Sequence, residues 1–273
     1  MADIAATKQH ASAVEVANPR SPGLRRIARK VARKAVVRER RLQRQLDSAR
    51  WLARPETRPA LTLAFPGDGL LDETVLRLKD VEVSIGGRTL LHNLNLRVRS
   101  GKRILLSGRN GIGKTTLLRV LSGEIEPRSG VVIGAHDAQL LPQTHDALRT
   151  SMTVLDFFRS RVPVYVDQAE ALLDAYLFSE QDWDSPLRTL SAGELRRLLL
   201  AVMVNSGTRV LLLDEPTNYL DFDSLEVIED ALRAYQGTLI MVTHDGYFAD
   251  RVGVTGSWRL ENASLSESEM VHA

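Results

Sequence analysis

The sequence predicts an α/β domain with a mainly parallel sheet, preceded by a long basic helix. Two short runs, RILLSG (103–108) and RVLLLDE (209–215), are almost entirely apolar up to their last residues, which is typical of parallel strands buried on both faces. Helical patterns alternate with such strands, as in MTVLDFFRSR (152–161) and DSLEVIEDALRAYQG (223–237). From Arg25 to Arg44 no proline or glycine interrupts a run of basic and aliphatic residues, which favours one continuous helix.

The net charge is divided unevenly between this helix and the rest of the chain. The 273 residues include 36 Lys and Arg against 34 Asp and Glu, a formal net charge of +2. Residues 23–46 contain ten basic residues and one acid, so this segment carries +9 and the remainder −7. A basic arm on a mildly acidic body predicts a polyanionic partner for the arm. The alternative is a solvated charged helix without a partner.

Composition also predicts boundaries along the chain. Residues 1–20 are small and polar and are expected to form a disordered tail. Ser21 and Pro22 suit the start of a helix, which is expected over 21–54 and ends at the prolines of ARPETRP (53–59). The α/β domain is expected over 59–262, followed by a flexible tail over 263–273.

The compartment is predicted from features that the sequence lacks. Cysteine is absent, and the longest apolar run has seven residues (198–204), against about 20 needed to cross a bilayer. The first residues lack the apolar core of a secretory signal. These features predict a cytoplasmic protein without a transmembrane segment of its own. An arginine-rich mitochondrial transit peptide is the alternative.

The segment GRNGIGKT (108–115) fits the phosphate-loop pattern G-x-x-x-x-G-K-[ST], between an expected strand and an expected helix. Glycines let backbone N–H groups surround phosphates at a helix N-terminus, where the helix dipole favours anions. Lys114 is predicted to reach the β- and γ-phosphates, and the Thr115 hydroxyl to coordinate Mg²⁺. The expected nucleotide contacts are Gly108, Arg109, Asn110, Gly111, Ile112, Gly113, Lys114, Thr115 and Thr116.

A second buried strand ends in two adjacent acids, in VLLLDEP (210–216). Asp214 is predicted to hold Mg²⁺, and Glu215 to polarise the attacking water as a general base. The alternative is a turn with two acids before Pro216. The apolar run that leads into the acids favours the site.

With both motifs in place, the chain resembles the ATP-binding cassette (ABC) ATPases over roughly residues 60–262. LSAGE (190–194) resembles the family signature L-S-G-G-Q, and LLPQ, NYLD and MVTHD resemble its Q-loop, D-loop and switch-histidine motifs. The resemblance implies a P-loop NTPase with a mainly parallel core sheet, an antiparallel β subdomain and a small helical subdomain. It also implies ATP hydrolysis to ADP and phosphate with Mg²⁺. The implied further residues are Gln143 (catalytic and Mg²⁺ ligand), His244 (γ-phosphate), and Ser191, Gly193, Glu194 and Asp221 (nucleotide, with the signature serving the opposite subunit).

The finer resemblance is to the second half, linker helix plus second cassette, of the ABC-F subfamily. EPTNYLD (215–221), the glutamate that ends the signature, and LEVIEDALRAYQGTLIMVTHDGYF (225–248) carry this resemblance. ABC-F proteins have two cassettes joined by a basic helical linker and act on ribosomes, some protecting them from antibiotics. The resemblance implies that the helix from Arg25 to Arg44 is an arm of that linker, lying against ribosomal RNA or transfer RNA.

Two residues depart from the family pattern. Ile85 stands where cassettes carry an aromatic residue that stacks on adenine, so nucleotide selectivity is expected to be poor. Ala192 replaces the first glycine of the signature, and this is expected to be tolerated.

One cassette holds two half-sites, so function is expected to need a second cassette, in a homodimer or on a separate chain. Three functions stay open. The first is an ABC-F cassette that acts on ribosomes, the second a nucleotide-binding subunit that pairs with a membrane permease, and the third an inactive fragment of a two-cassette protein.

Overall fold

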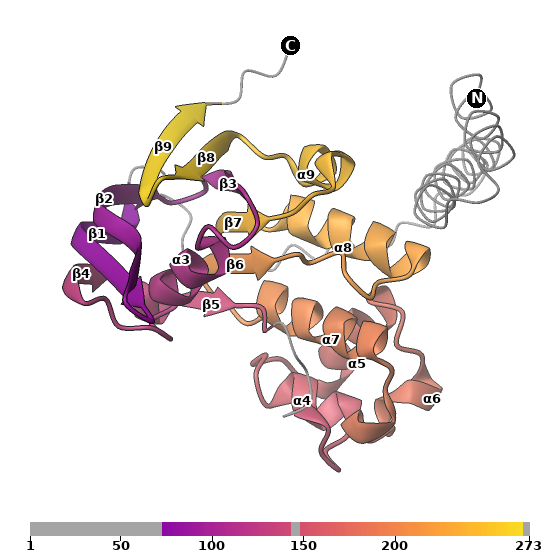
Figure 1. Cartoon of the computed structure of the whole chain (residues 1–273). Coiled ribbons are helices and arrows are strands. Elements are labelled where there is room, and N and C mark those ends of the chain that lie inside the picture. The colour runs from indigo at the N-terminus through magenta and orange to yellow at the C-terminus, as the bar shows by residue number, and fades with distance from the viewer. Residues whose placement is uncertain (1–72, 143–147, 270–273) are drawn as a thin grey trace, which may run out of the picture. The chain divides into compact units, whose positions relative to one another are not determined.

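The computed structural model describes residues 73–142 and 148–269, which belong to one compact unit, Leu61–Ala273. The expected tail (1–20), the basic helix (21–54) and Gln143 lie outside the described residues. Within the described residues, the predicted α/β architecture with its antiparallel and helical subdomains is confirmed (Figure 1).

The central sheet of the described chain has the strand order β5-β6-β7-β3-β8-β9. All neighbouring strands run parallel except β9, which is antiparallel to β8. The bounds are β3 Arg103–Ser107, β5 Ala138–Leu140, β6 Val210–Asp214, β7 Thr238–Val242, β8 Gly256–Glu261 and β9 Ser264–Glu269.

Successive residues of the central strands enter two different hydrophobic clusters. In β6, Leu211 and Leu213 pack in one cluster, whereas Val210 and Leu212 pack in the other. Side chains alternate between the two faces of a strand, so a strand covered on both faces needs apolar residues throughout. This explains the unbroken apolar run of β6.

One of these clusters is shared with helix α3 (Lys114–Leu121) and a three-stranded antiparallel sheet of order β2-β1-β4. Gly86 and Gly87 join β1 to β2 in a two-residue turn, and their φ angles of 59° and 79° favour glycine at both positions. The strands are β1 Thr74–Ile85, β2 Arg88–Arg99 and β4 Ser129–Ile133.

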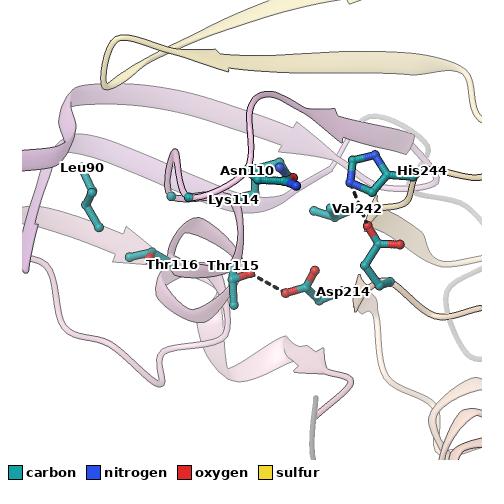
Figure 2. Close-up of a pocket in the computed structure, with 11 residues that line it drawn as sticks. Leu90, Asn110, Lys114, Thr115, Thr116, Asp214, Val242 and His244 are labelled. Carbon is teal, nitrogen blue, oxygen red and sulfur yellow. Dashed lines mark hydrogen bonds and ion pairs between the residues drawn. The ribbon is translucent and has the colours of Figure 1, made fainter. Parts of the chain in front are cut away.

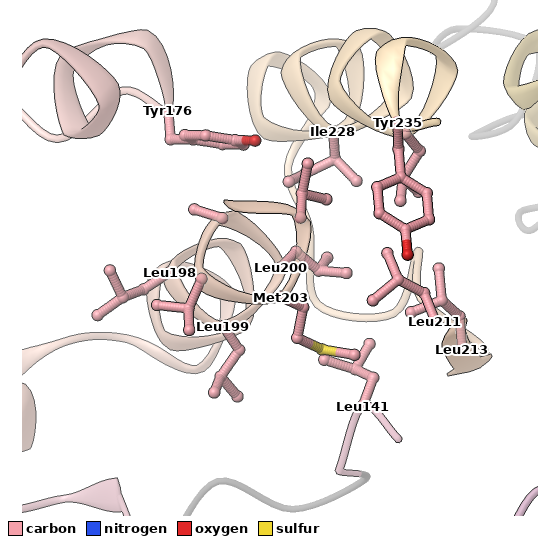
Figure 3. Packing of buried hydrophobic residues seen from close by; sticks show 14 of the residues in the cluster. Leu141, Tyr176, Leu198, Leu199, Leu200, Met203, Leu211, Leu213, Ile228 and Tyr235 are labelled. Carbon is pink, nitrogen blue, oxygen red and sulfur yellow. The ribbon is translucent and has the colours of Figure 1, made fainter. Parts of the chain in front are cut away.

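The other cluster is covered by helices. In Figure 3, Leu200 of α7, Ile228 of α8 and Leu211 of β6 lie in this cluster. None of the helices in the described ranges is both long and apolar enough to cross a membrane. The elements are α4 Val154–Arg159, α5 Val166–Ala175, α6 Glu180–Trp183, α7 Ala192–Asn205, α8 Phe222–Ala234, α9 Gly246–Val252, and the 3₁₀ turns η1 Ala135–Asp137 and η3 Leu187–Thr189.

The C-terminal segment differs from the expectation. The predicted flexible tail (263–273) is wrong for residues 264–269, which form β9 and pair with β8. Leu265 lies opposite Leu260 and packs against the core, and this apolar contact stabilises the pairing of β9 with β8. Asn262 and Ala263 form the turn with φ angles of 50° and 61°. The domain therefore continues past residue 262.

Candidate functional site

The predicted motifs meet at the carboxyl ends of three neighbouring parallel strands. The phosphate loop follows β3, Asp214 ends β6, and His244 lies just after β7. Carboxyl ends of parallel strands form the usual ligand-binding edge of such sheets. Together they line a pocket of about 350 Å³ (Figure 2). The predicted residues in its lining are Asn110, Gly111, Gly113, Lys114, Thr115, Thr116, Asp214, Glu215 and His244.

The phosphate loop has the backbone that its glycines allow. Gly108 has a φ of 146°, and a Cβ atom there would lie 2.7 Å from the backbone oxygen of Leu260. The Lys114 ammonium donates to the carbonyls of Gly108 at 2.8 Å and Arg109 at 3.1 Å. A positive charge is therefore held at the N-terminus of α3, where the helix dipole also favours anions. Ile112 packs toward the core instead of lining the pocket.

Two oxygen-bearing side chains meet beside this loop. The Thr115 hydroxyl donates to the Asp214 carboxylate at 2.6 Å, so α3 and β6 bring them together (Figure 2). Hydroxyl, carboxylate and carbonyl oxygens are the ligands that Mg²⁺ takes, so the pair fits the predicted metal. Gln143, the third predicted ligand, lies outside the described residues, but Pro142 directly before it lines a second pocket of about 150 Å³ with Thr115 and Asp214.

Glu215 and His244 lie together in the pocket lining. Their side chains are 27% and 69% exposed, and 3.5 Å separates Glu215 Oε1 from His244 Nε2. The φ of Glu215 is 48°, in the left-handed region, which costs a residue other than glycine about 1–3 kcal/mol. Its N–H donates to the Val242 carbonyl at 2.8 Å. A carboxylate held this way can accept a proton from water close to the phosphate loop.

The predicted signature residues lie outside this pocket, at the start of α7. Ser191 caps the helix, and its N–H and hydroxyl donate to the Glu194 carboxylate at 2.7 and 2.8 Å. A Cβ atom at Gly193 would lie 2.5 Å from the backbone oxygen of Tyr219, so this position favours glycine. Ala192 is the first residue of the helix.

Asp221, the predicted D-loop residue, also lies outside the pocket lining and caps α8 by accepting the Ser224 N–H at 2.9 Å. Hydrogen bonds from the Ser224 hydroxyl and N–H lower the pKa of Asp221, with a further contribution from the charge of Arg197.

Ile85 ends β1 and is 49% exposed. It does not line the pocket, whereas Leu90 on β2 does, together with Val242. The sequence patterns missed both of these aliphatic residues, because neither carries a chemical group that a motif would single out.

Arg196 is a further residue that the motifs missed. It is 1% exposed, and its guanidinium donates to the carbonyls of Asp214 at 2.9 Å and Glu215 at 2.8 Å. Burial lowers the pKa of Arg196, and the neighbouring Asp214 acts in the opposite direction. The sequence did contain a signal for this role. Leu199 and Leu200 follow Arg196 by three and four residues, so all three share one apolar face of the helix, where a charged side chain needs a buried partner.

A phosphate loop between β3 and α3, an Asp-Glu pair at the end of the buried strand β6, and a histidine after β7, which lies between β6 and β3, define an ATPase domain of the ABC class. The comparison with protein families agrees, because residues 91–218 match the family described as ABC transporter. Residues 91–218 therefore belong to an ABC ATPase domain, and domains of this class hydrolyse ATP.

Curated relatives are similar over 72–78% of this chain. The ATP-binding protein Uup of Caulobacter vibrioides is 37% identical over 205 residues, which cover 72% of this chain and 34% of Uup. The uncharacterized ABC transporter ATP-binding protein YfmR of Bacillus subtilis is 35% identical, with 72% and 33% covered. ABC transporter F family member 2 of Arabidopsis thaliana is 31% identical, with 78% and 32% covered. The chain thus matches about a third of the length of these relatives.

Solved structures share the fold. A dimeric post-hydrolysis state of the cassette MJ0796 bound to ADP and Pi has a TM-score of 0.60 at 21% identity, covering 72% of this chain and 100% of that one. The ATP binding subunit of an ABC transporter has a TM-score of 0.62 at 19% identity, covering 72% and 90%. At these identities the likeness concerns the fold alone.

Proposed function

We propose that this chain is a Mg-ATP-dependent ATPase cassette of the ABC-F type that works with a second cassette and acts on ribosomes. The observation that supports the ATPase most directly is the meeting of Lys114, the Thr115–Asp214 pair and Glu215 in one pocket. The proposed role at ribosomes rests on the resemblance to the ABC-F subfamily.

The roles follow from the positions of the side chains. Lys114 and the loop bind the nucleotide phosphates, and the Thr115 and Asp214 oxygens hold Mg²⁺, which neutralises phosphate charge when bound. Glu215 orients a water molecule and accepts its proton. His244 lies 3.5 Å from Glu215, where it can donate to a γ-phosphate oxygen. Gln143 is proposed, by resemblance, to contact the metal and the water.

The second cassette is needed because the proposed signature residues do not line this chain's own pocket. Ser191, Gly193 and Glu194 are proposed to contact the nucleotide of the partner, and the partner's signature to cover this one. The partner is a second copy of the chain or a cassette on another chain. Two of the structural neighbours are described as dimeric cassettes, which supports the proposed pairing.

The ABC-F assignment is supported by relatives whose names carry that family, including ABC transporter F family members 2 and 5 of Arabidopsis thaliana. It is supported further by the basic segment from Arg25 to Arg44, for which ribosomal or transfer RNA is the proposed partner. Ribosome protection against an antibiotic is one role of this type. The compartment proposed is the cytoplasm.

A second candidate is the nucleotide-binding subunit of a membrane transporter. The observation that favours it is the similarity to YfmR, whose name describes an ABC transporter ATP-binding protein. In that case the partner of the cassette is a permease, and the basic segment has no role at ribosomes. A third candidate is an inactive fragment, which predicts no turnover of ATP.

The proposed ATPase function is tested by removing the charge of the Glu215 side chain. Glu215→Gln removes the base and keeps the phosphate loop and metal ligands, so we expect ATP hydrolysis to fall about 10²–10⁴-fold while ATP binding persists. The ATP-bound variant should accumulate as a dimer in size-exclusion chromatography if this chain pairs with itself. Glu226→Gln, the same change at an exposed site on α8, serves as the control. Hydrolysis at the wild-type rate in Glu215→Gln would overturn the assignment.

A further inference from the structure

Arg196 is a buried charge whose position connects the parts of the proposed active site. Its side chain is 1% exposed on α7, less than one turn after Glu194. The guanidinium donates to at least four backbone carbonyls. These are Asp214 at 2.9 Å, Glu215 at 2.8 Å, Pro216 at 3.2 Å and Pro142 at 3.4 Å.

The acceptors belong to two chain segments that both carry predicted functional residues. Three of them are consecutive and include Glu215 itself, while the fourth, Pro142, directly precedes Gln143. The planar guanidinium presents five N–H donors in a fixed arrangement, so it can hold several carbonyls in one geometry.

The backbone of Glu215 needs such support. Its φ of 48° lies in a region that residues other than glycine rarely occupy. Such conformations persist where the surrounding structure determines them on several sides. The N–H of Glu215 is held by Val242 at 2.8 Å, and its carbonyl by Arg196 at 2.8 Å. The two hydrogen bonds hold the backbone on both sides of the Glu215 Cα and so set the direction in which its side chain leaves the backbone; Oε1 of this side chain lies 3.5 Å from His244 Nε2.

We propose that Arg196 is a positioning residue for ATP hydrolysis, which holds the 214–216 backbone so that the Glu215 carboxylate stays directed into the pocket. The proposal rests on the ATPase function proposed above. Arg196 also ties this backbone to α7, whose first residues are the signature that would face the partner cassette.

Arg103 offers a matched comparison. Its guanidinium also donates to at least four backbone carbonyls, and burial lowers its pKa as it does that of Arg196. Arg103 begins β3, at the opposite end of the strand from the phosphate loop, and touches no pocket residue among its acceptors. Those acceptors are Leu232, Arg233, Tyr235 and Val252.

The experiment compares Arg196→Met, Arg196→Lys and Arg103→Met in the full chain, with kcat, KM for ATP, and Tm measured for each. We expect Arg196→Met to lower kcat at least tenfold with KM within twofold of wild type. Arg196→Lys should give a kcat between those of Arg196→Met and the wild type. A single ammonium can still donate to one of the two backbone segments but cannot hold both. Arg103→Met should lower Tm by a similar amount and leave kcat within about threefold, with all rates taken below the melting transition.

A double variant separates positioning from general destabilisation. In the Glu215→Gln background the carboxylate base is already gone, so Arg196→Met should cause no further loss of single-turnover rate. Unchanged kcat in Arg196→Met, an equal loss in Arg103→Met, or losses that multiply in the double variant would each overturn the proposal. If Glu215→Gln itself turned over at the wild-type rate, the ATPase assignment would fail as well, and that outcome is distinct from the others.

Discussion

The residue at position 85 bears on how the cassette would hold a base. Ile85 is 49% exposed at the end of β1, and Leu90 on the next strand lines the pocket. Neither side chain has an aromatic ring, so both offer a base only aliphatic contacts. In the proposed function, Lys114 and the phosphate loop contact the triphosphate instead. We therefore expect affinity to come mainly from phosphates, and ATP and GTP to bind with similar strength.

Ile85→Tyr should tighten ATP binding, because stacking on an aromatic ring contributes about 1–3 kcal/mol per base. Isothermal titration calorimetry with ATP and with inorganic triphosphate measures the effect, and only ATP should gain. Ile133→Tyr is the matched control, since Ile133 is a similarly exposed isoleucine of the same antiparallel sheet and does not line the pocket. Equal ATP affinities for wild type and Ile85→Tyr would mean that the base does not lie beside position 85.

At the scale of elements, the sequence predicted those strands and loops whose conformation is determined by their own residues. The run of β6 is apolar because Leu211 and Leu212 face different cores, and the phosphate loop needs its glycines for backbone geometry. Features that depend on distant partners could not be predicted this way. The sequence of α7 indicates that Arg196 needs a buried partner, but which carbonyls it meets depends on how α7 packs against β6.

The hairpin of β8 and β9 shows the same limit. SLSESE (264–269) has Leu265 as its single apolar residue, and the turn before it is Asn262-Ala263 without glycine. Both turn residues have positive φ angles, as type I′ hairpin turns require. β9 forms because it pairs with β8 and because Leu265 contacts the core. Both are tertiary interactions, which local sequence patterns do not reveal. Ala263 is therefore a residue strained by its surroundings.

Ala263→Gly should stabilise the domain. Glycine relieves about 1–2 kcal/mol of left-handed strain, but the greater entropy of its unfolded chain costs about 0.4–1 kcal/mol of stability, so the net gain lies between about 0 and 1.6 kcal/mol, near 0.8 kcal/mol at the midpoints. Tm should rise by about 1–4 °C in differential scanning calorimetry. Asn262→Gly is the control and should gain less, because asparagine tolerates this conformation better than alanine. A lower Tm for Ala263→Gly would contradict the turn geometry.

At the scale of the whole molecule, the proposed functions occupy separate parts of the chain. The nucleotide pocket is formed by residues of the unit Leu61–Ala273, whereas the basic run lies in the unit Met1–Ala60, outside the described residues. The +9 charge of residues 23–46 contrasts with −7 for the rest, so attraction to a polyanion is expected from the first unit alone. Changes in the basic run should therefore leave nucleotide binding intact.

The ribosomal role predicts that the basic run binds RNA through charge. Ten basic residues can neutralise several phosphates and release counterions, so affinity should fall steeply as salt rises. Because this run has no aromatic residue, its side chains cannot stack on bases through aromatic rings, and little sequence preference is expected. Exchanging Arg29, Arg33 and Arg40 for glutamate in the Glu215→Gln protein should release it from ribosomes in a sedimentation assay, with ATP affinity unchanged.

The matched control exchanges the same three arginines for lysine, which keeps the charge and should keep the sedimentation with ribosomes, since binding depends on phosphate neutralisation. Loss of sedimentation in the lysine variant would mean that arginine-specific contacts, not charge alone, hold the RNA. The transporter alternative predicts a different pattern, in which the ATP-bound Glu215→Gln protein is recovered with membranes that contain a permease and never with ribosomes. Absence of ribosome binding even at low salt would remove the ABC-F role and leave the ATPase, because the nucleotide pocket does not depend on the basic run.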